Sequence, residues 1–135
     1  MNRNILLNLN ITRFKELKRL ILIRIGLKSS DSIKFLYNFE SLEEFDISDN
    51  EFRNDDGIFM QNSINLKILK LRNCSLEKLN HIFLDFSFFE LLEYLDLSYN
   101  KIKEISFFNF PYFMKFLNLS HNNVYKDPDL QRFFN

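Results

Sequence analysis

Apolar residues recur along the chain at a fixed set of offsets. The segment Leu92–Ile102 has apolar side chains at its first, fourth, sixth and eleventh positions and an asparagine at its ninth. Four other segments share the apolar offsets, and they are Leu17–Leu27, Leu42–Phe52, Leu66–Leu76 and Met114–Val124. Successive segments start 22 to 26 residues apart. Five matches in register indicate an array of small structural repeats that start at 17, 42, 66, 92 and 114.

Within each repeat, the fourth and sixth positions alternate with outward positions in the way of a short β-strand. We expect strands near residues 19–23, 44–48, 68–72, 94–98 and 116–120. One such strand cannot bury its apolar face alone, so the repeats must stack side by side. Leu71, Leu95, Leu97 and Leu117 occupy inward positions and are predicted to be buried.

The pattern L-x-x-L-x-L-x-x-N/C-x-L resembles that of the leucine-rich repeat family, from about Leu17 to Val124. The resemblance implies an α/β fold: a right-handed solenoid with a parallel, concave β-sheet of about five strands, and short helices or turns on its convex side. The segment from Asn50 to Cys74, with Asp56-Gly57 in its middle, resembles the ribonuclease-inhibitor type of repeat. The shorter interval before Met114 leaves room only for a tight turn, so mixed repeat types are expected.

The ninth position of the repeats holds Ile25, Asn50, Cys74, Asn100 and Asn122. In the family this asparagine forms a ladder in which its buried amide bonds to backbone groups of adjacent turns, as a buried amide must. Cysteine is a known substitute there, and we interpret Cys74 as a small buried side chain. Ile25 breaks the pattern, which suggests that the first repeat acts partly as a cap.

A single domain over residues 1–135 is expected, since the chain is 46% hydrophobic and has only two glycines. Residues 1–16 are predicted to cap the N-terminal end of the array, although a truncated or partner-covered first repeat would have the same sequence features. Residues 125–135 are predicted to form a C-terminal cap. There, Asp127-Pro128-Asp129 followed by Leu130 has the order of a helix start.

Charge is balanced both overall and locally. The chain has 18 Lys and Arg against 18 Asp and Glu, so a polyanion or an anionic membrane would not be attracted to it as a whole. No apolar run approaches the roughly 20 residues of a spanning helix. The second position of the repeats alternates in sign, with Lys18, Glu43, Lys67, Glu93 and Lys115. Neighbouring parallel strands lie about 4.8 Å apart, so these side chains are expected to pair.

Catalytic, metal and cofactor sites are not predicted. The single Cys74 and the two histidines, His81 and His121, fall far apart in the array, so neither a nucleophile–base pair nor a metal cluster is expected. Two glycines provide no phosphate-binding loop. Asp46, Asp49, Asp55 and Asp56 lack the spacing of a calcium loop and fit a solvated turn and a helix cap. One cysteine, without a disulfide framework, favours a cytoplasmic protein over a secreted one.

Three consecutive repeats place large apolar residues at the outward third position, where the first two repeats have Arg19 and Glu44. These residues are Ile68, Tyr94 and Phe116, and Tyr99 and His121 flank them at the eighth position. In the family, partners commonly use this concave face, and aromatic side chains contribute much of the energy at interfaces. The five residues are therefore candidates for partner binding. Alternatively, they pack only on one another or under the C-terminal cap.

The function predicted from these features is a non-catalytic protein–protein interaction module that binds a protein or peptide on its concave face. The alternative is a small structural or regulatory subunit that is permanently packed in a larger macromolecular assembly. Nucleic-acid binding is disfavoured, because Lys18, Arg19, Arg24 and Lys70 are interleaved with carboxylates.

Overall fold

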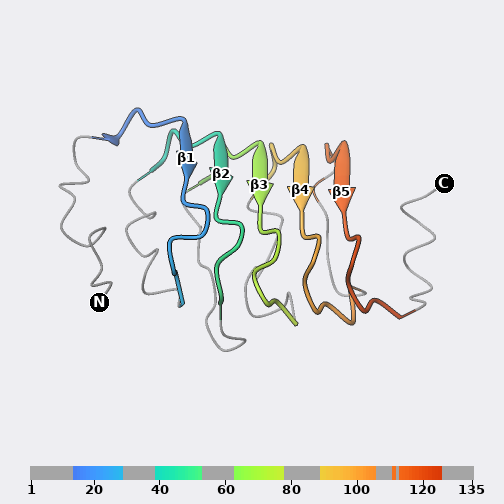
Figure 1. Ribbon diagram of the computed structural model, residues 1–135. Coiled ribbons are helices and arrows are strands. Elements are labelled where there is room, and N and C mark those ends of the chain that lie inside the picture. The colour runs from blue at the N-terminus through green and yellow to red at the C-terminus, as the bar shows by residue number, and fades with distance from the viewer. Residues whose placement is uncertain are drawn as a thin grey trace.

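Five short strands form one parallel sheet in the computed structural model, which describes residues 14–28, 39–52, 63–77, 89–105, 111 and 113–125. The strands are β1 (Arg19–Ile21), β2 (Glu44–Asp46), β3 (Ile68–Lys70), β4 (Tyr94–Asp96) and β5 (Phe116–Asn118). They lie side by side in chain order and point the same way (Figure 1). The prediction of an open parallel sheet with one strand from each repeat is confirmed.

The sheet register aligns equivalent positions of successive repeats. Leu20 pairs with Phe45, and Phe45 pairs with Leu69. Leu69 pairs in turn with Leu95, and Leu95 with Leu117. Each repeat position therefore forms a row across the sheet, so that side chains 22 to 26 residues apart in sequence become direct neighbours.

The strands end two residues earlier than the sequence pattern predicts. In three repeats, the fifth-position side chain accepts a hydrogen bond from the backbone N–H two residues on: Asp46 Oδ1 from Ser48 at 3.0 Å, Asp96 Oδ1 from Ser98 at 2.9 Å, and Asn118 Oδ1 from Ser120 at 3.0 Å. Asp and Asn side chains commonly turn the backbone in this way. The eighth position then has φ between +53° and +59° in all five repeats, at Arg24, Asp49, Asn73, Tyr99 and His121. This left-handed conformation ends the extended chain.

The core lies on one side of the sheet and is built mainly from the first, fourth, sixth and eleventh positions of the repeats. Leu71, Leu95 and Leu97 are fully buried, as predicted. The prediction for Leu117 is wrong, because this side chain is only half-buried. It lies on β5, which among the described residues has a neighbouring strand on one side only.

Asparagines at the ninth position tie consecutive repeats together, as predicted. Asn100 Oδ1 accepts hydrogen bonds from the N–H groups of Cys74 at 2.9 Å and Leu76 at 3.0 Å. Its Nδ2 donates to the carbonyls of Leu71 at 2.8 Å and Leu97 at 2.9 Å. Asn50 and Asn122 make corresponding bonds, each to its own repeat and to the repeat before it. Each amide thus satisfies buried backbone groups that belong to two repeats.

Cys74 replaces an asparagine in this ladder and is fully buried. Its thiol donates to the carbonyl of Ile47 at 3.4 Å, and so takes over part of the role of an amide nitrogen. The N–H of Phe52, which corresponds to the Leu76 N–H that donates to Asn100, donates to the backbone carbonyl of Cys74 at 3.1 Å. Ile25, which breaks the pattern, has a side chain that is 41% exposed.

Several expectations concern segments outside the described residues. These are the convex helices, the turn at Asp56-Gly57 that resembles a ribonuclease-inhibitor repeat, and nearly all of the two caps over residues 1–16 and 125–135. The limits of the domain remain predictions as well.

Candidate functional site

The sheet has a solvent-facing side, which we call the sheet face, formed by the outward third, fifth and seventh positions of the repeats. Charged residues predominate over β1 and β2, where the third and fifth positions include Arg19, Glu44 and Asp46. Apolar third positions follow on β3, β4 and β5. At the third position the sheet face therefore has a charged half over β1 and β2 and an apolar half over β3 to β5. The fifth position does not follow this division, since it holds Ile21 on β1 and Lys70 on β3.

Side chains at the second position form an ion-pair ladder along one end of the strands. Lys18 lies 3.0 Å from Glu43, Lys67 lies 2.8 Å from the other oxygen of Glu43, and Lys115 lies 2.9 Å from Glu93. Hydrogen bonds from Lys67 and Lys18 lower the pKa of the Glu43 carboxyl, and Glu43 in turn raises the pKa of Lys67. The predicted pairing of alternating charges is thus present between three of the four neighbouring pairs at this position, and Lys67 and Glu93 do not form an ion pair.

Ion pairs also cover the charged half itself. Arg19 Nε lies 2.8 Å from Glu44, and Lys70 Nζ lies 3.2 Å from the second oxygen of Glu44. Lys70 is also 3.9 Å from Asp46. Since these charges neutralise one another, the charged half offers few free groups to a partner.

The three residues predicted at the third position come together as one row, which we call the apolar stripe. The register pairs Ile68 with Tyr94 and Tyr94 with Phe116. The rings of Tyr94 and Phe116 stack with centroids 4.4 Å apart and planes only 8° apart. Ile68 and Tyr94 are half-buried, whereas Phe116 is 43% exposed. The stripe therefore packs on itself and still presents aromatic surface to solvent.

Tyr99 and His121, the other two candidate residues, stack at the opposite end of the strands. Their ring centroids are 4.0 Å apart with a 22° interplanar angle. The guanidinium carbon of Arg72 lies 3.9 Å from the Tyr99 ring centroid, and Arg72 Nη1 donates to Ser98 Oγ at 3.3 Å. We refer to these three residues as the Arg72–Tyr99–His121 stack.

A role for Arg72 was not predicted from the sequence, although the repeat pattern contains a signal for its contact with Tyr99. An arginine at the seventh position of one repeat is followed, one repeat later, by an aromatic residue at the eighth position. In a parallel sheet with aligned repeats these two positions are diagonal neighbours, so that a cation can lie over the ring.

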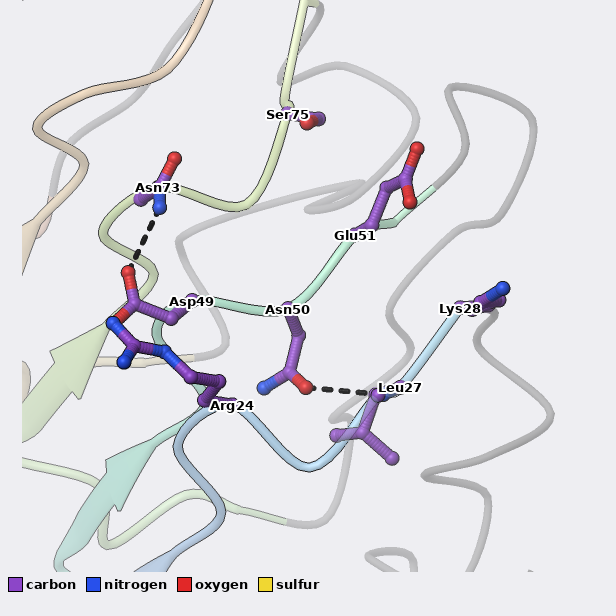
Figure 2. A pocket seen from close by; sticks show the side chains of 9 residues that line it. Arg24, Leu27, Lys28, Asp49, Asn50, Glu51, Asn73 and Ser75 are labelled. Atoms are coloured by element: carbon purple, nitrogen blue, oxygen red, sulfur yellow. Dashed lines mark hydrogen bonds and ion pairs between the residues drawn. The ribbon is translucent and has the colours of Figure 1, made fainter. Parts of the chain in front are cut away.

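An open pocket of about 390 Å³ lies where the first three repeats leave the sheet (Figure 2). Arg24 pairs with Asp49 at 2.9 Å, and Asn73 Nδ2 donates to the other oxygen of Asp49 at 2.8 Å. The bond from Asn73, more than Arg24, lowers the pKa of Asp49. Asn50 also lines the pocket, and its Oδ1 already accepts a hydrogen bond from the N–H of Leu27 at 3.0 Å. These polar groups satisfy one another, so the pocket is less suited to a ligand than the apolar half.

Within the described ranges, possible metal ligands are dispersed and no long apolar helix is present. There, no three His, Cys, Asp or Glu side chains are grouped so that they could hold a metal ion. Nor do these ranges contain a helix of the length and apolar character needed to cross a membrane.

A family model described as Leucine Rich Repeat matches residues 91–113, which include β4. The matched repeat is one of five whose strands align position by position in one parallel sheet. Residues 91–113 thus match a leucine-rich repeat, and the five aligned strands are consistent with a leucine-rich repeat solenoid. Curated proteins and solved structures gave no match to it. Leucine-rich repeats generally act as non-enzymatic modules in protein–protein interaction.

Because Cys74 is buried in the asparagine ladder, its contribution to the stability of the fold is expected to fall at alkaline pH. Burial raises the pKa of the thiol from 9.0 to about 12. Below pH 9 the folded and unfolded chains both keep the proton, so the contribution of the thiol to stability is fully present. Above pH 9 the unfolded chain loses the proton first, and the contribution falls by about 1.4 kcal/mol per pH unit until the folded thiol also ionises.

Urea unfolding of the wild type and of Cys74→Ala between pH 8 and pH 11 measures this effect. We expect the wild type to lose its stability advantage over the variant as the pH rises, because other titrating groups affect both proteins alike. Unfolding free energies that stay a constant distance apart across this range would contradict the burial of a protonated thiol.

Proposed function

We propose that the protein is a non-catalytic interaction module that binds a protein or peptide on the apolar half of its sheet face. The observation that supports this most is the stacked pair Tyr94 and Phe116, which remains partly open to solvent on the outward side of the sheet. Ile68 extends the same surface onto β3. Tyr99 and His121 provide a second aromatic pair at the far end of the strands.

Aromatic residues in an ordered array are well suited to binding. A side chain that is already held by stacking loses little conformational freedom when a partner covers it. Aromatic side chains and arginine are also enriched among residues whose truncation weakens interfaces most. The charged half of the sheet face keeps its ions paired internally, so it favours solubility and correct register more than recognition.

The test is a variant that removes the aromatic surface, Tyr94→Ser together with Phe116→Ser. Wild-type and variant proteins are immobilised, partners are captured from the native source and identified by mass spectrometry, and affinity for the purified partner is then measured by calorimetry. We expect the variant to bind at least about tenfold more weakly, since aromatic hot-spot residues commonly contribute 2 kcal/mol or more. Circular dichroism and thermal melting report whether the variant keeps its fold.

Ile21→Ser together with Ile23→Ser is the matched control. These side chains are 44% and 42% exposed and belong to the same face, but they lie on and just after β1. We expect this variant to bind like the wild type. A folded Tyr94/Phe116 variant with unchanged affinity would show that the partner binds elsewhere.

The second candidate function is that of a subunit held permanently in a larger assembly. Exposed isoleucines at the first repeat favour it, because Ile21, Ile23 and Ile25 are each 41% to 44% exposed and β1 is an edge strand. An obligate subunit would be oligomeric or poorly soluble alone, whereas an interaction module would elute as a monodisperse monomer in size-exclusion chromatography.

A cytoplasmic location and the lack of nucleic-acid binding are part of this proposal. Support for the location comes from the single cysteine, which leaves no internal disulfide for an oxidising compartment to form. Support for the second point comes from the carboxylates, such as Glu43 and Glu44, that alternate with the cations of the sheet face.

A further inference from the structure

Arg72 differs from all other cations at positions two to eight of the described repeats. Each of the others has a carboxylate oxygen 2.8 to 3.2 Å away, and they are Lys18, Arg19, Arg24, Lys67, Lys70 and Lys115. Arg72 forms no ion pair with any carboxylate of the described residues. Among the described residues, the guanidinium of Arg72 is therefore the one cation of this face without a carboxylate in ion-pair contact, although it is near enough to Asp49 to help lower the pKa of that carboxyl.

The guanidinium is nevertheless held in place. It lies over the ring of Tyr99, which stacks in turn on His121, and it donates one hydrogen bond to Ser98 Oγ. A guanidinium has five N–H donors, so most of them remain available to an acceptor. An ordered cation with free donors is suited to a carboxylate, which it can bind through two parallel hydrogen bonds.

We propose that the sheet face over β3 to β5 binds an extended peptide segment with a carboxylate side chain about four residues from a large apolar side chain. The carboxylate pairs with Arg72, and the apolar side chain lies on the apolar stripe. This inference rests on the proposed function and adds to it the chemistry of the partner.

The spacing follows from the repeat itself. The apolar stripe is at the third position and Arg72 is at the seventh, four residues further along the chain. An extended chain rises roughly 3.3 Å per residue and β3 ends at Lys70, so the backbone positions of the two features are at most about 13 Å apart along the strand direction. In an extended partner that lies along the strands, side chains four residues apart face the same way.

Charge complementarity favours a single carboxylate over a nucleic-acid backbone. Glu43, Glu44, Asp46, Asp49 and Asp96 surround the basic groups at positions two to eight, and they would repel a chain of phosphates. One carboxylate can be accepted locally, because the nearest acidic groups are engaged: Asp49 with Arg24 and Asn73, and Asp96 Oδ1 with the N–H of Ser98.

The experiment selects binders from a displayed library of random dodecapeptides on the purified wild-type chain. We expect enrichment of sequences with Asp or Glu four residues from Phe, Tyr, Leu or Ile. One selected peptide and its Glu→Gln counterpart are then titrated by fluorescence anisotropy against the wild type, Arg72→Gln and Arg72→Lys. Loss of the carboxylate should weaken binding to the wild type about tenfold, as expected for a charge-assisted pair, and should change binding to Arg72→Gln less than about twofold.

Arg24→Gln is the matched control, since it removes the same charge from an arginine that already pairs with Asp49. It should keep the full preference for the carboxylate peptide. Arg72→Lys should lose part of that preference, because an ammonium neither stacks nor binds in two-pronged fashion.

Three outcomes would overturn the inference. Selected peptides that bind the wild type equally well with Glu or Gln would refute the pairing of a partner carboxylate with Arg72. If the same peptides bind the Tyr94/Phe116 variant more weakly, the proposed function still holds. Failure to select any peptide, or a wild-type chain that forms a dimer through this face, would refute the extended-peptide partner. Binding of an oligouridylate that depends on Arg72 would reassign the stack to nucleic acid.

Discussion

Asn100→Ala is expected to lower the free energy of unfolding by about 3 to 5 kcal/mol, because it removes the partners of several buried backbone groups at once. The N–H groups of Cys74 and Leu76 lose their acceptor, and the carbonyls of Leu71 and Leu97 lose their donor. Asn100 is 5% exposed, so water cannot readily replace these bonds. Urea unfolding followed by circular dichroism measures the loss.

Asn100→Asp separates the loss of hydrogen bonds from the loss of volume. A carboxylate at this position keeps the acceptor for Cys74 and Leu76 but faces the Leu71 and Leu97 carbonyls without a proton to donate, so at neutral pH it should destabilise at least as much as alanine. The exposed Asn123→Ala should change stability by less than about 0.5 kcal/mol. A loss below 1 kcal/mol for both Asn100 variants would mean that the ladder contributes little to stability.

Leu95→Ala is expected to destabilise the fold by about 2 to 5 kcal/mol, through lost transfer free energy and a cavity between repeats. Leu95 is fully buried at the fourth position of β4, between Leu69 and Leu117 in the register. Both neighbouring strands limit how far the structure can close around the missing atoms. Chemical unfolding of the variant measures the effect.

Leu117→Ala provides the comparison, since it is the same substitution at the same repeat position one strand further. Leu117 is only half-buried on the edge strand β5, so its loss should be about half that of Leu95 or less, because both the buried area and the cavity are smaller. If the two variants lose equal stability, the assignment of β5 as an edge is wrong.

Repeat spacing predicted the position of every strand, and the resemblance to leucine-rich repeats added the parallel sheet and the asparagine ladder. Asn50, Asn100 and Asn122 bond as the pattern implies. Pairing of Lys18 and Lys67 with Glu43 was also predictable, since alternating charges at one position must become neighbours in the aligned sheet.

Other features depend on context that the repeat pattern does not contain. Strand length was overestimated in all five repeats, and in three of them a local side-chain bond from Asp46, Asp96 or Asn118 turns the backbone after the strand. Burial of Leu117 was overestimated because an edge strand has the same sequence pattern as an internal one. The stacking of Tyr94 on Phe116 and of Arg72 on Tyr99 depends on side-chain rotamers, which a single sequence does not specify.

Because charges alternate in sign at the second position, the loss of one repeat and the loss of two repeats have opposite effects on neighbouring charges. Loss of the single repeat that starts at residue 66 would bring Glu43 beside Glu93, and loss of the repeat that starts at 92 would bring Lys67 beside Lys115. Like charges directly opposite each other on a sheet are destabilising. Removal of both repeats together would place Glu43 beside Lys115 and restore attraction. Unequal recombination among these repeats is therefore better tolerated when it adds or removes them two at a time.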